Sequence, residues 1–157
     1  MKTQSPEKQL AGFIAKFTPA MAAFIREARK KMRERLPQAV ELVYDNYNFF
    51  VIGYGPSEKA SEAIFSLAAQ AKGVNLCVLH GAGLPDPTGL LKGSGHVVRN
   101  IRLETAATLD RADVRTLMKT ALDRAKSPMG PKGVHRLIIK SVSAKQRPRR
   151  PVVAAKQ

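Results

Sequence analysis

The hydrophobic pattern of this chain changes its period at Pro37. Before that residue, apolar side chains recur every three or four positions, the spacing of one face of an α-helix. After it come short apolar segments rich in β-branched and aromatic residues and bounded by turn-forming residues, which is typical of β-strands. Helices followed by a run of strands constrain the chain to an α+β fold.

Two helices are expected before Pro37. Each begins with a capping residue followed by proline, Ser5-Pro6 for the first and Thr18-Pro19 for the second. The second helix carries basic side chains opposite its apolar stripe, but two glutamates interrupt them. We interpret this basic face as a solvated helix surface.

Five strands are expected between residues 40 and 103. The connection at residues 71–73 has a length suited to a hairpin, and strands that follow one another directly pair most simply as antiparallel neighbours. A last helix is predicted from an N-cap at Asp110 to about Ala125. Residues 137–139 are expected to add an edge strand or to dock on the core.

The sequence therefore predicts one architecture. It is an α+β fold with an antiparallel five- or six-stranded sheet, against which two N-terminal helices and one C-terminal helix pack. We expect this domain to span residues 1–126.

The net charge of +15 is unevenly distributed along the chain. Residues 126–157 carry nine Lys or Arg and no Asp or Glu, whereas residues 1–125 carry 18 basic and 12 acidic groups. Charged residues and prolines bury little apolar area. We therefore predict a basic extension over residues 127–157 that is disordered beyond about residue 143.

This extension contains the candidate nucleic-acid contacts. A cationic run attracts polyanions, and four charges predict weak, salt-sensitive and non-specific binding. The alternative is a solvated tail that aids solubility. The candidate residues are Lys145, Arg147, Arg149 and Arg150.

A second candidate site is a glycine-containing loop that leads into the fifth predicted strand. Glycines let backbone N–H groups approach an anion, and the neighbouring side chains are hydrogen-bond donors. A polar and aromatic cluster at the end of the first strand has a composition suited to a planar or polar ligand. A flexible turn and ordinary cross-strand packing are the alternatives. The candidate ligand-binding residues are Tyr44, Tyr47, Lys92, Ser94, His96, Arg99 and Arg102.

Residues 41–125 resemble the YdhG-like family, domain-of-unknown-function family 1801. The resemblance is carried by four segments: residues 42–47, 74–76, 81–95 and 98–104. It implies a compact α/β domain with an antiparallel sheet and does not imply a reaction.

Some members of the broader family look like frataxin-type iron chaperones, whose function depends on clustered carboxylates. In this chain the acidic residues are scattered, and only Glu58 with Glu62 and Asp110 with Asp113 are paired locally. An iron-chaperone function is therefore disfavoured.

Motifs of catalysis and metal binding are absent from the sequence. The three histidines are far apart, no Cys-x-x-Cys or His-Glu-x-x-His spacing occurs, and the single Cys77 lies in an apolar run. We expect no catalytic residues, no metal and no cofactor. The N-terminus lacks a signal sequence and no segment reaches about 20 apolar residues, so we expect a cytoplasmic protein without a membrane partner.

Three hypotheses follow. The first is a non-enzymatic binding module for a small anionic or polar ligand. The second is a nucleic-acid-associated accessory protein that uses its basic extension. The third, a frataxin-like iron chaperone, is disfavoured by the basic charge.

Overall fold

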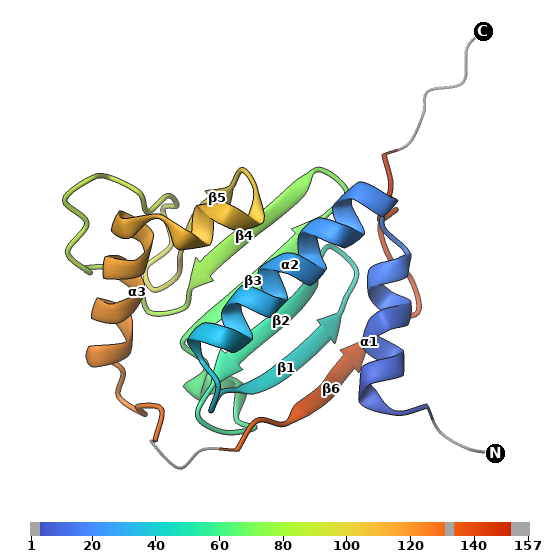
Figure 1. The fold of residues 1–157 in the computed structure, drawn as a ribbon, viewed down its shortest axis with the longest axis horizontal. Helices are drawn as coiled ribbons and strands as arrows, with labels where there is room; N and C mark the ends of the chain where they lie inside the picture. The colour runs from blue at the N-terminus through green and yellow to red at the C-terminus, as the bar shows by residue number, and fades with distance from the viewer. Residues whose placement is uncertain (1–3, 131–133, 152–157) are drawn as a thin grey trace, which may run out of the picture.

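A computed structural model describes residues 4–130 and 134–151 (Figure 1). Six strands form one sheet in the order β5-β4-β3-β2-β1-β6. Neighbouring strands are antiparallel except β1 and β6, which are parallel. The strands are β1 (Val40–Asp45), β2 (Phe50–Gly55), β3 (Phe65–Gln70), β4 (Gly73–Val78), β5 (Arg99–Leu103) and β6 (Leu137–Val142).

The helices are α1 (Pro6–Ala15), α2 (Pro19–Arg35) and α3 (Ala112–Asp123), with 3-10 turns η1 (Ala60–Glu62) and η2 (Ala106–Asp110). The predicted α+β fold with its two N-terminal helices and one later helix is confirmed, and the parallel β6 makes the sheet mixed. Ser5 and Thr18 accept hydrogen bonds from the backbone N–H groups of the first helical turns, as their caps predict.

The predicted cap of the last helix is wrong. Asp110 ends η2, and α3 begins two residues later. The Asp110 carboxylate instead lies 2.6 Å from Lys31 Nζ and 2.9 Å from Arg35 Nη2, so it pairs with the basic face of α2.

The core lies between the helices and one face of the sheet. One buried row crosses five strands in register, formed by Val43, Ile52, Leu67, Leu76 and Ile101. Figure 1 shows α1 and α2 lying across this face, with α3 at the side of the sheet that β4 and β5 form. Burial of these side chains is the main stabilising contribution to the fold.

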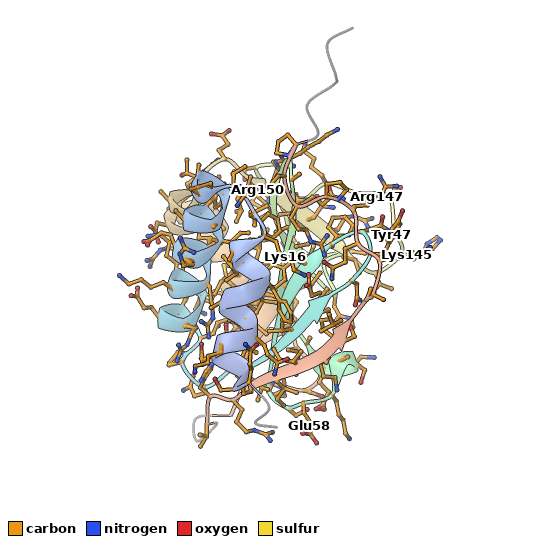
Figure 2. The ribbon with its side chains drawn as sticks, turned by 90° about the vertical axis from the view of Figure 1, so that its right-hand side faces the viewer. Lys16, Tyr47, Glu58, Lys145, Arg147 and Arg150 are labelled. Carbon is orange, nitrogen blue, oxygen red and sulfur yellow. The ribbon has the colours of Figure 1, made fainter. Side chains whose placement is uncertain are left out.

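The opposite face of the sheet carries a second row in register, which we call the open row. Its members are Tyr44, Val51, Ala68, Asn75 and Arg102. Figure 2 shows the described helices α1 and α2 on the other side of the sheet. The segment that follows η1 covers the part of this face farthest from the β1–β2 turn. The absence of a side chain at Gly55 lets Ala63 approach there, since a Cβ at Gly55 would lie 2.8 Å from Ala63 Cα.

The C-terminal segment, residues 134–151, differs from its prediction. β6 pairs in parallel with β1, with a register shift between Val43 and Tyr44. Beyond it, Ser143 N donates to Asp45 O and Arg147 N donates to Tyr47 O, both at 2.8 Å. The predicted disorder beyond about residue 143 is therefore wrong for residues 143–151, which hydrogen-bond to β1 and to the β1–β2 turn. Residues 152–157 lie outside the described residues.

Over residues 4–130 and 134–151, none of the helices combines the length and the apolar character needed to cross a membrane.

Candidate functional site

Two buried carboxylates on β1 hold the C-terminal segment in place. Strand alternation directs Glu41, Val43 and Asp45 toward the helices, and both acidic residues are 0% exposed. Carboxylates removed from water need charged partners and hydrogen bonds. Each carboxylate has at least one partner within residues 134–151.

Asp45 forms ion pairs with one residue near each end of the chain. Lys16 Nζ, at the end of α1, lies 2.8 Å from Oδ2, and Arg149 Nη2 lies 2.9 Å from Oδ1. Gln146 Nε2 donates to the Asp45 carbonyl at 2.7 Å. Burial alone would raise the pKa of Asp45, but the hydrogen bonds, led by that from Lys16, outweigh it and hold the pKa below its ordinary value.

Glu41 is paired at the other end of β1. Arg29 of α2 makes two hydrogen bonds to it, at 2.9 and 3.0 Å, and the Tyr54 hydroxyl donates at 3.0 Å. His135 Nε2 lies 2.7 Å from Oε1. Burial opposes ionisation of Glu41, yet these bonds, led by those from Arg29, lower its pKa. A carboxylate with four such contacts anchors structure and has little capacity left for a ligand.

Arg149 is fixed by its contacts with Asp45 and with the neighbouring backbone. The Arg149 side chain is almost fully buried, its Nη2 also donates to the Asn46 carbonyl at 2.6 Å, and its Nε is enclosed without a hydrogen-bond partner among the described residues. Arg149, predicted as a nucleic-acid contact, is therefore an internal anchor. Its neighbours Arg147 and Arg150 are exposed.

Arg147 lies against the β1–β2 turn. Its Nε donates to Asn48 Oδ1 at 2.9 Å, and its guanidinium lies 5.6 Å from the centroid of the Tyr47 ring, which is 50% exposed. Figure 2 shows Tyr47, Lys145 and Arg147 on the side of the sheet away from α1 and α2. Arg150 turns the other way and donates to the Lys16 carbonyl at 3.1 Å, at the C-terminal end of α1.

A hollow joins Arg147 to the β3–β4 turn. It has a volume of about 460 Å³, and its polar lining comes from Asn48, Gln70, Lys72, Arg147, Arg149 and Arg150. Arg102, at the end of the open row, reaches the same turn and donates to the Lys72 carbonyl at 2.5 Å. We call the four exposed cations here the basic rim: Lys72, Arg102, Lys145 and Arg147.

The candidate residues of the glycine-containing loop lie elsewhere. The Lys92 backbone pairs with Asn100 on the outer edge of β5, and Arg99 Nη1 donates to carbonyls of its own segment. Lys92, Ser94 and His96 are exposed. The sheet order inserts three strands between β5 and β1, so these residues and Arg99 share no cleft with Tyr44 and Tyr47. The small-ligand site predicted from both groups is not assembled.

Of the acidic residues that are close together in the sequence, Glu58 and Asp113 form ion pairs with basic side chains of the protein. Glu58, at the opposite end of the molecule from Arg147 in Figure 2, lies 3.7 Å from Arg136 Nη1, and Asp113 lies 2.7 Å from Arg111 Nη2. In the part of the chain that the structure describes, no three His, Cys, Asp or Glu side chains come close enough together to hold one metal ion. Burial raises the pKa of the half-buried Cys77 thiol.

Reasoning from sequence missed the two anchoring carboxylates. The pattern of β1 alternates Val40, Leu42 and Tyr44 with Glu41, Val43 and Asp45, and the apolar content favours the first set as the buried one. One signal in the sequence pointed to these carboxylates. Glu41 and Asp45 lie four residues apart within one strand, and the C-terminal extension has basic residues but no acid to pair with them.

Comparison of the chain with models of known protein families, with curated proteins and with solved structures finds no match. The resemblance to the YdhG-like family therefore stays a prediction.

Proposed function

We propose that this protein is a cytoplasmic, non-enzymatic binding module that takes nucleic acid at the basic rim. The observation that carries the proposal is the docking of residues 143–151, which brings Lys145 and Arg147 to the end of the sheet where Lys72 and Arg102 lie. The YdhG-like resemblance supports a compact domain of this kind. Within the proposal, the small-ligand and iron-chaperone hypotheses are set aside.

Ion pairing separates the rim from Arg29, Lys31 and Arg35 of α2, whereas the exposed Arg26 and Lys30 of that helix, like the rim, have no ion pair among the described residues. On α2, Arg29, Lys31 and Arg35 each lie within 3.2 Å of a carboxylate, so their charge is largely neutralised inside the protein. Among the ion pairs of the described residues, none involves a member of the basic rim. Cations without a carboxylate partner keep the charge that phosphates can neutralise.

Phosphate binding by four cations has a measurable salt dependence. Each phosphate neutralised on duplex DNA contributes about −0.9 to the slope of log K against log salt, so four contacts predict a slope of about −3.6. Such contacts give affinity without base sequence preference.

The test is fluorescence anisotropy of labelled duplex oligonucleotides at several salt concentrations. The double substitution Lys72→Gln with Arg147→Gln is expected to weaken binding and to reduce the slope by about 1.8, since two of four contacts are lost. Lys92→Gln with Lys126→Gln is the matched control, because it removes the same charge from exposed positions outside the rim. Absence of binding at low salt, or equal losses in the two variants, would overturn the proposal.

A further inference from the structure

We infer that the nucleic acid is single-stranded and that its bases stack on the tyrosines beside the basic rim. This inference rests on the proposed function and names the class of ligand that the same surface takes. Its starting observation is that Tyr44 and Tyr47 lie at the end of the sheet that the rim surrounds.

The open row joins an aromatic end to a cationic end. From Tyr44 it continues through Val51, Ala68 and Asn75 to Arg102. Tyr44, Val51 and Asn75 are half-buried, Ala68 is buried, and Arg102 is exposed. Four strand spacings separate the two ends, about 19 Å. Between the two ends, the half-buried Asn75 offers an amide that can hydrogen-bond to base edges.

Tyr47 extends this surface past the end of β1. Its ring is half exposed, and Arg147 lies against it while also bonded to Asn48. Aromatic rings and guanidinium planes are the groups on which unpaired bases stack. The side chains that would contact a base are therefore held in place before a ligand arrives, which lowers the entropic cost of binding.

Duplex nucleic acid fits the same surface less well. A duplex keeps its bases stacked inside and offers phosphates and groove edges, and reading its major groove takes a helix or a two-stranded ribbon that enters the groove. The open row is part of the sheet surface and cannot enter a groove. Tyr44 and Tyr47 would therefore meet only the sugar-phosphate backbone of a duplex. The half-exposed Tyr47 ring beside the basic rim gains stacking area only from unpaired bases.

The experiment compares a short labelled oligothymidylate with the same strand annealed to oligoadenylate. Wild-type protein is expected to bind the single strand more tightly. Tyr47→Ala is expected to weaken single-strand binding by about 5-fold to 150-fold, the range measured for one stacked base, and to leave duplex binding unchanged. Tyr44→Phe, which keeps a ring, is expected to bind as the wild type does, whereas Tyr44→Ala is expected to lose affinity for the single strand.

Arg147→Lys separates stacking from charge. It keeps the cation and removes the planar guanidinium, so it is expected to weaken single-strand binding by a larger factor than duplex binding. The chain has three tyrosines and no tryptophan, so quenching of tyrosine fluorescence gives a second readout. Circular dichroism and melting temperature verify that each variant is folded.

The outcomes separate the two proposals. Equal affinity for single strand and duplex, with no effect of the tyrosine substitutions, would overturn this inference and leave nucleic-acid binding by the rim intact. Absence of binding to either probe would overturn both.

Discussion

The two edges of the sheet are held by different interactions. At the β5 edge, the preceding loop makes one isolated bridge, between Lys92 and Asn100, and its polar side chains point into solvent or bond to their own backbone. At the β6 edge, the strand pairs along its length with β1, and buried Glu41 and Asp45 bind His135 and Arg149 on either side of it. The loop before β5 is rich in Gly and Pro, and residues 143–151, which follow β6, are rich in basic residues and Pro and poor in periodic apolar ones. A segment of this composition becomes a fixed part of the fold when the sheet offers it a buried opposite charge.

The largest effect is expected from Glu41→Gln. This substitution removes the anion from Arg29 and His135, and Arg29 belongs to a helix that cannot leave the core. Breaking a buried pair from one side costs about 3–5 kcal/mol, so the free energy of unfolding is expected to fall by about that amount in denaturant titrations. The control Glu34→Gln, exposed on α2, is expected to stay within about 0.5 kcal/mol of the wild type. Equal effects of the two substitutions would contradict the anchoring function of Glu41.

Asp45→Asn is expected to cost less and to act locally. Lys16 is 43% exposed at its side chain, and Arg149 can turn into water if residues 143–151 leave the sheet. The loss is therefore limited to about 1–3 kcal/mol, the cost of leaving a donor without its acceptor. Trypsin is expected to cleave the Lys145–Gln146 bond faster in the variant. An unchanged cleavage rate would show that the segment is held in some other way.

Acid titration tests both carboxylates together. Their folded-state pKa values lie below the ordinary values of 4.5 for Glu41 and 3.8 for Asp45. The stability that they contribute is present in full above those ordinary values and is lost as the pH falls through the lower, folded-state values. The double variant Glu41→Gln with Asp45→Asn is expected to show a flatter dependence of stability on pH over this acid range. Parallel curves for wild type and variant would exclude the two groups as the source.

The smallest effect is expected at the β5 edge. Lys92→Ala and His96→Ala remove exposed side chains that make no hydrogen bond or ion pair within the described structure. Each is expected to change the free energy of unfolding by less than about 0.5 kcal/mol. A loss as large as that of Asp45→Asn would remove the contrast between the two edges.

Local chemistry explains why much of the fold was predictable. The Ser5 and Thr18 caps begin the first two helices, and the two-residue connection after Gln70 closes the predicted hairpin. The face of β1 was not predictable, because both of its alternating sets contain apolar residues. The anchoring of the C-terminal segment was not predictable either, since the Asp45–Arg149 pair joins residues 104 positions apart.

The candidate site was predicted in pieces. Tyr44, Tyr47 and Arg102 were assigned to a small ligand, and Lys145 and Arg147 to a disordered tail, yet all five lie around one end of the sheet. Sheet order, which a sequence does not state, separates Tyr44, Tyr47, Lys145 and Arg147 from Lys92, Ser94, His96 and Arg99. Arg102 lies on the same strand as Arg99, at its other end.

The most direct test of the account is native-state hydrogen exchange at two backbone amides. Ser143 N and Arg147 N donate to carbonyls of Asp45 and Tyr47, beyond the last residue of β6. In the wild type both amides are expected to exchange at least about tenfold more slowly than in a free peptide, and this protection is expected to disappear in Asp45→Asn. Exchange at the free-peptide rate in the wild type would show that the segment does not dock and that the basic rim does not form.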